Sequence, residues 1–223
     1  MKIVSWNCNG KFREKLEYIK ILNADIYIIQ ECEDPQKYNN TDYLNFSEYA
    51  IWIGDNQNKG LGIFAKNFIS IKPNDNFKSF CLRYFLPVVV NNSFNLLAVW
   101  ACKPYIEEYY IYQCINKSNF DKNTIVMGDF NSNAIWDKKH NFRSHSNVVK
   151  ELKELGLTSA YHFVLNENQG EETQQTFYLY RHKDKGYHID YAFADTSKVK
   201  SFHIDDKDFW LNYSDHKPII LEI

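Results

Sequence analysis

The sequence predicts an α+β protein in which two packed sheets carry helices on their outer faces. Short strand-like segments recur along most of the 223 residues, and only a few helical patterns separate them. The composition, with 44% hydrophobic and 24% charged residues, is that of a globular chain and excludes a disordered one. No internal repeat and no linker rich in glycine, serine or proline interrupts the sequence. We therefore expect a single domain over residues 1–223.

The first strands and the first helix are expected near the N-terminus. Lys2–Trp6 is a short β-type segment, and Asp25–Ile29 is a continuous apolar run, which is typical of a buried strand. Between them, Lys11–Leu22 places apolar residues at positions i, i+4 and i+7. This spacing predicts an amphipathic helix.

Strand signals dominate the chain from Tyr49 to Cys102. The expected strands are Tyr49–Ile53, Leu61–Ala65, Phe68–Ile71, Phe77–Tyr84, Leu86–Val90 and Phe94–Ala101. Short polar turns join several of these segments, and such turns favour antiparallel pairing.

Helices and strands alternate in the second half of the chain. A helix is expected from Pro104 through Ile115, because proline is favoured at the first helical position. Thr124–Met127 has the apolar character of a buried strand, and a further helix is expected to begin at Ser144 or Ser146 and to end at Gly156. The last expected strands are Thr176–Tyr180, Tyr187–Ala194, Val199–Ile204 and Pro218–Ile223.

Charge and cysteine content exclude several classes of protein. Lys plus Arg number 26 and Asp plus Glu number 28, so the chain does not hold nucleic acid by bulk charge alone, although a local basic rim remains compatible with this balance. The five cysteines are odd in number and lack CxxC spacing, which favours reduced thiols over a disulfide framework or a zinc ribbon. Neither a signal peptide nor a membrane-spanning segment is evident. We therefore expect a soluble, cytoplasmic protein that does not associate with membranes and is a monomer.

Several polar residues lie directly beside the predicted buried strands. They are Asn7, Asn9, Glu31, Asp129, Asn131, Asp190, Asp215 and His216. Each of them alone could belong to an ordinary turn or to a solvated strand end. Asp190 is harder to explain in this way, since a charge within the apolar strand Tyr187–Ala194 is costly to bury without a partner. Carboxylate and amide oxygens without thiolates suit Mg²⁺, with Mn²⁺ as a substitute.

Five motifs in this set resemble those of the endonuclease/exonuclease/phosphatase superfamily, which includes exonuclease III, abasic-site endonucleases and deoxyribonuclease I. The motifs are Ser-Trp-Asn7-Cys-Asn9-Gly, Gln-Glu31, Gly-Asp129-Phe-Asn131, His-Ile-Asp190-Tyr and Ser-Asp215-His216-Lys-Pro. They follow the order of the family and span Ser5 to Pro218. The resemblance implies one catalytic domain with a four-layer αββα sandwich and a single metal-dependent site.

The resemblance also implies a role for each matching residue. The residues expected at the metal are Glu31 as the principal ligand, Asp215 as a second acidic group, and Asn7, close to both metal and phosphate. The expected catalytic residues are Asp129 and Asn131, which orient or activate the attacking water, and Asp190, which orients His216 toward the scissile phosphate. Either Asp129 or His216 could take the proton of the water.

Three further residues are candidates for contact with phosphate or substrate. Asn9 lies within the first motif, beside Asn7. Lys103 follows the strand after which family members carry a tyrosine or histidine. The role of that side chain is therefore either vacant here or filled by Lys103. The alternative is that Lys103 is a solvated lysine at the start of a helix. His188 precedes Asp190 by two positions and is expected on the same face of a strand, with a structural histidine as the alternative.

These observations lead to a first functional hypothesis and two alternatives. We expect a divalent-metal-dependent phosphodiesterase that hydrolyses nucleic acid, in the first place DNA, by attack of an activated water on phosphorus. The first alternative is a hydrolase of the same superfamily that acts on RNA or on a small or lipid phosphoester. The second alternative is a binding protein that keeps the fold without catalysis.

Overall fold

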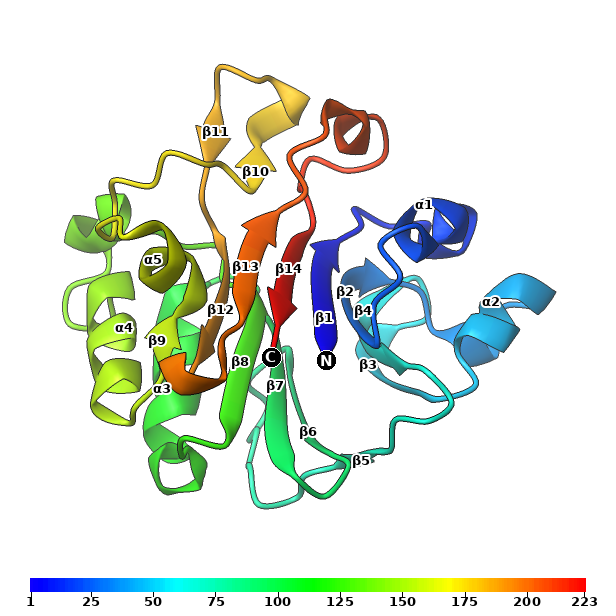
Figure 1. Cartoon of the computed structure of the whole chain (residues 1–223), viewed down its shortest axis with the longest axis horizontal. Helices are drawn as coiled ribbons and strands as arrows, with labels where there is room; N and C mark the ends of the chain where they lie inside the picture. Colours follow the sequence, from blue (N-terminus) through cyan, green and yellow to red (C-terminus); the bar gives the residue numbers. More distant parts are fainter.

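The computed structural model describes residues 1–223 and contains two six-stranded sheets that pack face to face (Figure 1). The strands of the first sheet are, in spatial order, β13 (Ser201–Ile204), β14 (Ile219–Glu222), β1 (Lys2–Asn7), β2 (Ile26–Cys32), β4 (Lys59–Ala65) and β3 (Ala50–Asn56). Those of the second sheet are β5 (Ile71–Pro73), β6 (Phe85–Val90), β7 (Phe94–Trp100), β8 (Thr124–Asp129), β12 (Asp190–Ala194) and β9 (Thr158–Ser159). The predicted α+β sandwich of two mainly antiparallel sheets is confirmed.

Helices cover the outer faces of this sandwich. Figure 1 shows α1 (Leu16–Lys20) and α2 (Thr41–Phe46) on one side, and α3 (Ile106–Ile115), α4 (His145–Glu154) and α5 (Ala160–Leu165) on the other. The arrangement is therefore the predicted four-layer αββα sandwich. None of these helices has the length and the apolar character that crossing a membrane requires.

Two strand pairs are parallel, whereas the other pairs are antiparallel. β1 runs parallel to β2, with Asn7 beside Gln30, and β7 runs parallel to β8, with Trp100 beside Asp129. Carboxyl ends of parallel strands meet at the same edge of a sheet. Polar residues at the ends of strands far apart in sequence therefore come together at one edge of the sandwich.

Burial on both faces explains the continuous apolar segments of the sequence. In β1, Ile3 belongs to the cluster between the two sheets, while Val4 and Trp6 belong to the cluster under the outer helices. The Trp6 ring packs edge-on against Phe12 and Trp210. The central strand β1 is thus fixed from both sides, and it holds Asn7 at its end.

Several expected elements differ from the structure at their boundaries. The helix expected over Lys11–Leu22 is divided into a 3-10 turn at Phe12–Glu14 and the short α1. The helix expected from Ser144 or Ser146 is α4, which begins at His145 and is capped by Ser144, whose side chain accepts a hydrogen bond from the Asn147 backbone N–H. The strand expected at Phe68–Ile71 begins only at Ile71.

The strand expected at Phe77–Tyr84 is wrong, because these residues form an irregular loop before β6. Phe80 and Cys81 within it have positive φ angles, which are incompatible with a regular strand. The apolar character of the segment serves packing, since the Phe77 ring contacts Phe120 and Tyr112.

The strand expected over Tyr187–Ala194 is interrupted. Tyr187 ends β11 (Gly186–Tyr187), which pairs with β10 (Phe177–Tyr178), and β12 begins only at Asp190. The backbone N–H groups of Ile189 and Asp190 both donate to the hydroxyl of Thr176, at 3.0 and 3.1 Å. Two consecutive N–H groups that bind one oxygen break the alternation of a strand.

Candidate active site

Side chains from five segments of both sheets converge at one edge of the sandwich. Asn7 ends β1, Glu31 lies in β2, Asp129 ends β8, Asp190 begins β12 and His216 lies shortly before β14. Asp129 and Asp190 stand directly opposite one another in the β8–β12 ladder. All of these residues are buried except Glu31, whose side chain is 16% exposed.

The amide of Asn7 lies between two carboxylates. Its Nδ2 donates to Asp129 Oδ2 at 3.0 Å and to Glu31 Oε1 at 3.3 Å. The backbone N–H of Asn9 donates to Asn7 Oδ1 at 3.0 Å, which fixes the orientation of the amide. Asn7 therefore connects two like charges that would otherwise repel one another.

Asn131 holds the carboxylate of Asp129 from the other side. Its backbone N–H donates to Asp129 Oδ1 at 2.8 Å, and its Nδ2 donates to Asp129 Oδ2 at 2.9 Å. Gly128 is required beside this pair, because a Cβ at that position would lie 2.0 Å from the Val99 carbonyl oxygen. The motif Gly-Asp-Phe-Asn thus combines a close approach of two strands with a fully hydrogen-bonded carboxylate.

His216 is oriented by Asp190. The His216 Nδ1 lies 2.9 Å from Asp190 Oδ2, and its Nε2 lies 4.0 Å from Asp129 Oδ2. The Phe177 ring packs against the imidazole at 4.8 Å between ring centroids. Potential metal-ligand atoms of Asp129, Asp190 and His216 all lie within 4.8 Å of one another.

Burial and charge shift the pKa values of this group strongly. Burial raises the pKa of Asp129 to about 7, with the charge of His216 lowering it and that of Asp190 raising it further. Burial alone would lower the pKa of His216, but the attraction of Asp190 and then of Asp129 raises it to about 10. At neutral pH the imidazole is therefore positively charged and can donate from Nε2.

Lys59 is a member of the site that the sequence did not reveal. Its Nζ lies 2.6 Å from Glu31 Oε2, and it also lies over the ring of Trp100 at 5.9 Å. Glu31 has a φ of 63° and stands where the β2–β4 register shifts, which turns its side chain out of the regular ladder. In the sequence Lys59 is only a lysine after a polar turn, so no local signal could have identified it.

The structure places Asp215 beside the site and His188 and Lys103 outside it. The Asp215 carboxylate accepts from Ser214 Oγ at 3.5 Å and makes no hydrogen bond to Glu31 or Asn7. His188 was expected to share a strand face with Asp190 but does not, because the strand is interrupted between Tyr187 and Asp190. Its buried ring packs against Tyr161 and Tyr191 instead, while Lys103 is exposed on the turn after β7.

Two packed sheets that present buried carboxylates, amides and a charged imidazole at one edge are typical of phosphoester hydrolases. The sequence matches the model of the Endonuclease/Exonuclease/phosphatase family over residues 4–216, and the chain belongs to this family. A comparison with curated proteins finds no match.

Solved structures with the same fold include several nucleases. A 3'-5' exonuclease from Neisseria meningitidis is 18% identical, with 100% of this chain and 99% of that chain covered and a TM-score of 0.72. An AP endonuclease from Archaeoglobus fulgidus is 16% identical, with 99% and 98% covered and a TM-score of 0.71. The endonuclease domain of TRAS1, a telomere-specific retrotransposon, is 16% identical, with 99% and 96% covered and a TM-score of 0.65. At these identities the likeness concerns the fold.

Proposed function

We propose that residues 1–223 form one catalytic domain that hydrolyses phosphodiester bonds of nucleic acid, in the first place DNA, with a divalent metal ion. The observation that carries this proposal is the convergence of Glu31, Asn7, Asp129 and the Asp190–His216 pair at one edge of the sandwich. The choice of substrate is supported by a solved structure with this fold, that of a Neisseria 3' phosphatase bound to a product DNA hairpin.

The side chains fit a hard divalent cation such as Mg²⁺, for which Mn²⁺ can substitute. They offer carboxylate and amide oxygens rather than thiolates, and the Glu31 carboxylate already pairs with a cation, the ammonium group of Lys59. Glu31 and Asp215 are the residues proposed to hold the ion, with Asn7 next to it. When bound, such an ion neutralises charge on the phosphate and stabilises the leaving oxygen.

The side chains of the cluster can act on both a water and a phosphate. Asp129, held by Asn131 and Asn7, accepts the proton of a water whose oxygen forms the new bond to phosphorus. His216, held by Asp190, donates from Nε2 to a phosphate oxygen as negative charge develops there. The bond between phosphorus and the leaving oxygen breaks, and that oxygen takes up a proton from the solvent. In the alternative assignment His216 takes up the water's proton, which requires that the imidazole, charged at neutral pH, first gives up its own.

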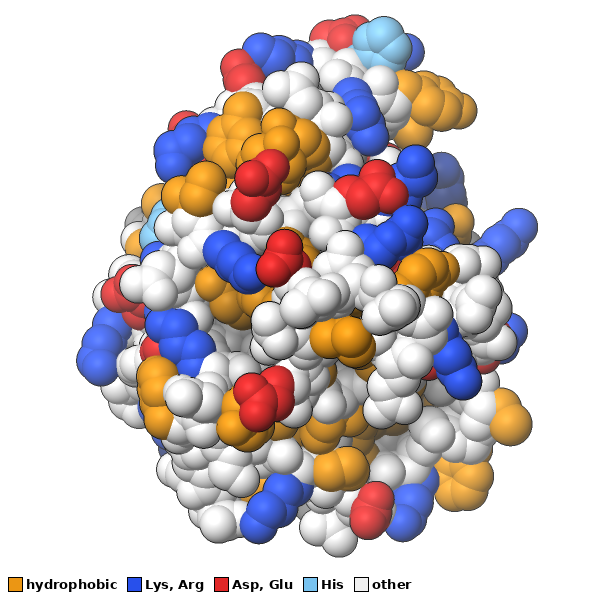
Figure 2. Space-filling view, turned by 90° about the vertical axis from the view of Figure 1, so that its right-hand side faces the viewer, with side chains coloured by type: hydrophobic (Ala, Val, Ile, Leu, Met, Phe, Trp, Pro, Cys, Tyr) orange, Lys and Arg blue, Asp and Glu red, His pale blue; other side chains and the backbone are white.

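The surroundings of the site suit a polyanionic substrate. Figure 2 shows lysine and arginine side chains, interspersed with acidic ones, over the upper part of the face formed by α1, α2 and β3, which is the end where the site lies. Such a local distribution can contact several phosphates although the formal net charge of the chain is only −2. Asn9, which follows β1 beside Asn7, stays a candidate for phosphate contact, whereas Lys103 would have to reach the phosphate from the exposed turn after β7.

Hydrolysis of defined oligonucleotides tests the proposal. We expect the purified chain to cleave single-stranded or duplex DNA with Mg²⁺ or Mn²⁺, and we expect EDTA to abolish the cleavage. The Glu31→Ala and His216→Ala variants should lose it as well. No cleavage of any DNA with either ion would overturn the proposal, and cleavage of RNA or of a small phosphoester alone would favour the first alternative.

A further inference from the structure

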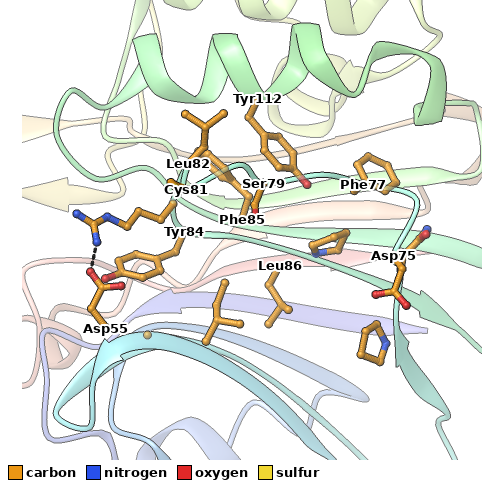
Figure 3. Close-up of a pocket in the computed structure, with 16 residues that line it drawn as sticks. Asp55, Asp75, Phe77, Ser79, Cys81, Leu82, Tyr84, Phe85, Leu86 and Tyr112 are labelled. Atoms are coloured by element: carbon orange, nitrogen blue, oxygen red, sulfur yellow. Dashed lines mark hydrogen bonds and ion pairs between the residues drawn. The ribbon is translucent and has the colours of Figure 1, made fainter.

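A cleft of about 570 Å³ lies near the candidate active site, since its lining residue Tyr84 stacks on Trp100, the ring over which Lys59 lies. Figure 3 shows the cleft between β3, the loop of residues 74–84 and helix α3. Its lining includes Ile53, Asp55, Leu86 and Tyr112. None of these residues takes part in the site described above, so the cleft has no role in the proposed hydrolysis itself.

The hydroxyl of Tyr112 is the strongest sign that this cleft receives a ligand. Tyr112 is fully buried, and its oxygen has no hydrogen-bond partner. Figure 3 shows the side chain extending from α3 toward the cleft. A buried hydroxyl without a partner is costly, and an acceptor atom in the cleft would satisfy it. Tyr109 on the same helix is equally buried and unpartnered but does not line the cleft.

A row of aromatic and basic side chains connects the cleft to Glu31. Tyr84, which lines the cleft, stacks on Trp100 with ring centroids 5.0 Å apart and an interplanar angle of 14°. Lys59 lies over the same Trp100 ring and reaches Glu31 at 2.6 Å. Trp100 itself is buried, so a strand whose phosphate lies at Glu31 meets the Lys59 ammonium group and the partly exposed Tyr84 ring on its way to the cleft. A cation next to an aromatic ring is a combination that binds single-stranded nucleic acid.

The polar groups of the cleft favour a nucleobase over a phosphate. At one end Arg83 pairs with Asp55, and Asp75 lies at the other end, with Leu86 between them (Figure 3). Two carboxylates repel a phosphate, whereas they accept hydrogen bonds from the amino groups of a base. The Tyr112 hydroxyl and the Arg83 guanidinium donate to carbonyl and ring nitrogen acceptors. An apolar floor with donors and acceptors at its rim matches a planar heteroaromatic ring.

We propose that this cleft binds one unpaired nucleobase of the nucleic-acid strand whose phosphate lies at the active site. The proposal rests on the proposed function and makes it more specific, because a base held in the cleft is unpaired. Strands with single-stranded or frayed segments next to the cleaved bond are then the preferred substrates. Tyr112 and Tyr84 would fix the base, and the phosphodiester chemistry would stay with the residues around Asp129.

Steady-state hydrolysis of short single-stranded DNA oligonucleotides tests this inference. One set carries a single abasic spacer at successive positions, and a small aryl phosphodiester serves as a substrate too short to reach the cleft. Tyr112→Phe should raise KM for the oligonucleotide about three- to tenfold, the effect of one lost hydrogen bond. Tyr109→Phe is the matched control and should leave KM unchanged. Ser79→Trp, which fills the cleft from its exposed rim, should raise KM about tenfold, and Ser79→Ala should not.

The position of the missing base provides a second measurement. In the wild type, an abasic spacer at the position whose base occupies the cleft should raise KM to the same extent as Ser79→Trp does. In the Ser79→Trp variant, the same spacer should not raise KM any further. Turnover of the small diester should be the same in every variant. If neither Ser79→Trp nor Tyr112→Phe affects oligonucleotide hydrolysis, the inference about the cleft is overturned and the proposed function stands. This holds even if a free mononucleotide binds in the cleft. A wild type that hydrolyses no nucleic acid would instead overturn the proposed function, and the inference with it.

Discussion

Replacement of Asp190 by asparagine tests the arrangement of the candidate active site most directly. The side chain keeps its shape, but its negative charge, which lies 2.9 Å from His216 Nδ1, is lost. Both side chains are buried, with exposed fractions of 2% for Asp190 and 4% for His216. Water therefore cannot replace the carboxylate as a partner of the charged imidazole.

The size of the effect follows from what remains around the imidazole. Removal of one partner of a buried ion pair costs about 3–5 kcal/mol, because the other charge stays buried. Asp129 Oδ2 at 4.0 Å still provides a negative charge, so we expect the lower end, about 3 kcal/mol of unfolding free energy. The asparagine can also present its NH₂ group to Nδ1 and so disturb the imidazole, and comparable changes in catalytic triads lower kcat by about 10⁴.

Urea unfolding and oligonucleotide hydrolysis measure the two effects separately. With a slope near 3 kcal/mol per M, Asp190→Asn should lower the urea midpoint by about 1 M while the slope stays unchanged. Asp184→Asn is the matched control, since the Asp184 side chain is exposed and makes no ion pair or hydrogen bond; this variant should leave both measurements unchanged. An Asp190→Asn variant within about 0.5 kcal/mol of wild type and within about tenfold of its kcat would refute the reasoning.

Three other changes should have distinct effects. Burial lowers the pKa of His145 from 6.5 to about 4. Between these two pH values His145 is therefore protonated in the unfolded chain but stays neutral in the folded chain. The unfolding free energy should therefore fall by about 3 kcal/mol between pH 6.5 and pH 4, relative to His145→Gln, as urea titrations at several pH values would show. Gly128→Ala should cost about 4 kcal/mol or more in thermal unfolding, whereas Gly10→Ala, with a φ of 74° but no atom within 4 Å of the new Cβ, should cost about 1–2 kcal/mol. Lys59→Met should tighten Mg²⁺ binding about two- to fivefold by calorimetry, because the ammonium group no longer competes for Glu31; weaker binding would contradict this reading.

The sequence predicted those parts of the fold in which local pattern and burial agree. β2 and β8 are continuous apolar segments because both faces of each sheet are covered, and both were expected. The helices α2 and α5 were missed, since six residues are too few to show a helical period. The loop containing Phe77 was mistaken for a strand because its aromatic residues pack against α3 instead of pairing.

The candidate site shows the same division between local and distant information. Asp129 and Asn131 were predicted because their motif directly follows a predicted buried strand and resembles a family motif, and their mutual hydrogen bonds span only two residues of sequence. Lys59 was missed, since its contact with Glu31 depends on the β2–β4 pairing and on the register shift at Glu31. His188 was misplaced because a hydroxyl from Thr176, 12 positions earlier in the sequence, interrupts the strand before Asp190.

The same contacts separate a rigid part of the site from an adjustable one. Asp129 and Asp190 stand opposite one another in a ladder, and each carboxylate has fixed hydrogen-bond partners, so their spacing is set by the sheet. Glu31 lies where the ladder shifts, is the most exposed member of the cluster, and pairs with Lys59, which is 48% exposed. Exposed ion pairs are weak and exchange readily. We therefore expect cation binding to rearrange Glu31 and Lys59, while the Asp129–Asp190–His216 group keeps its geometry.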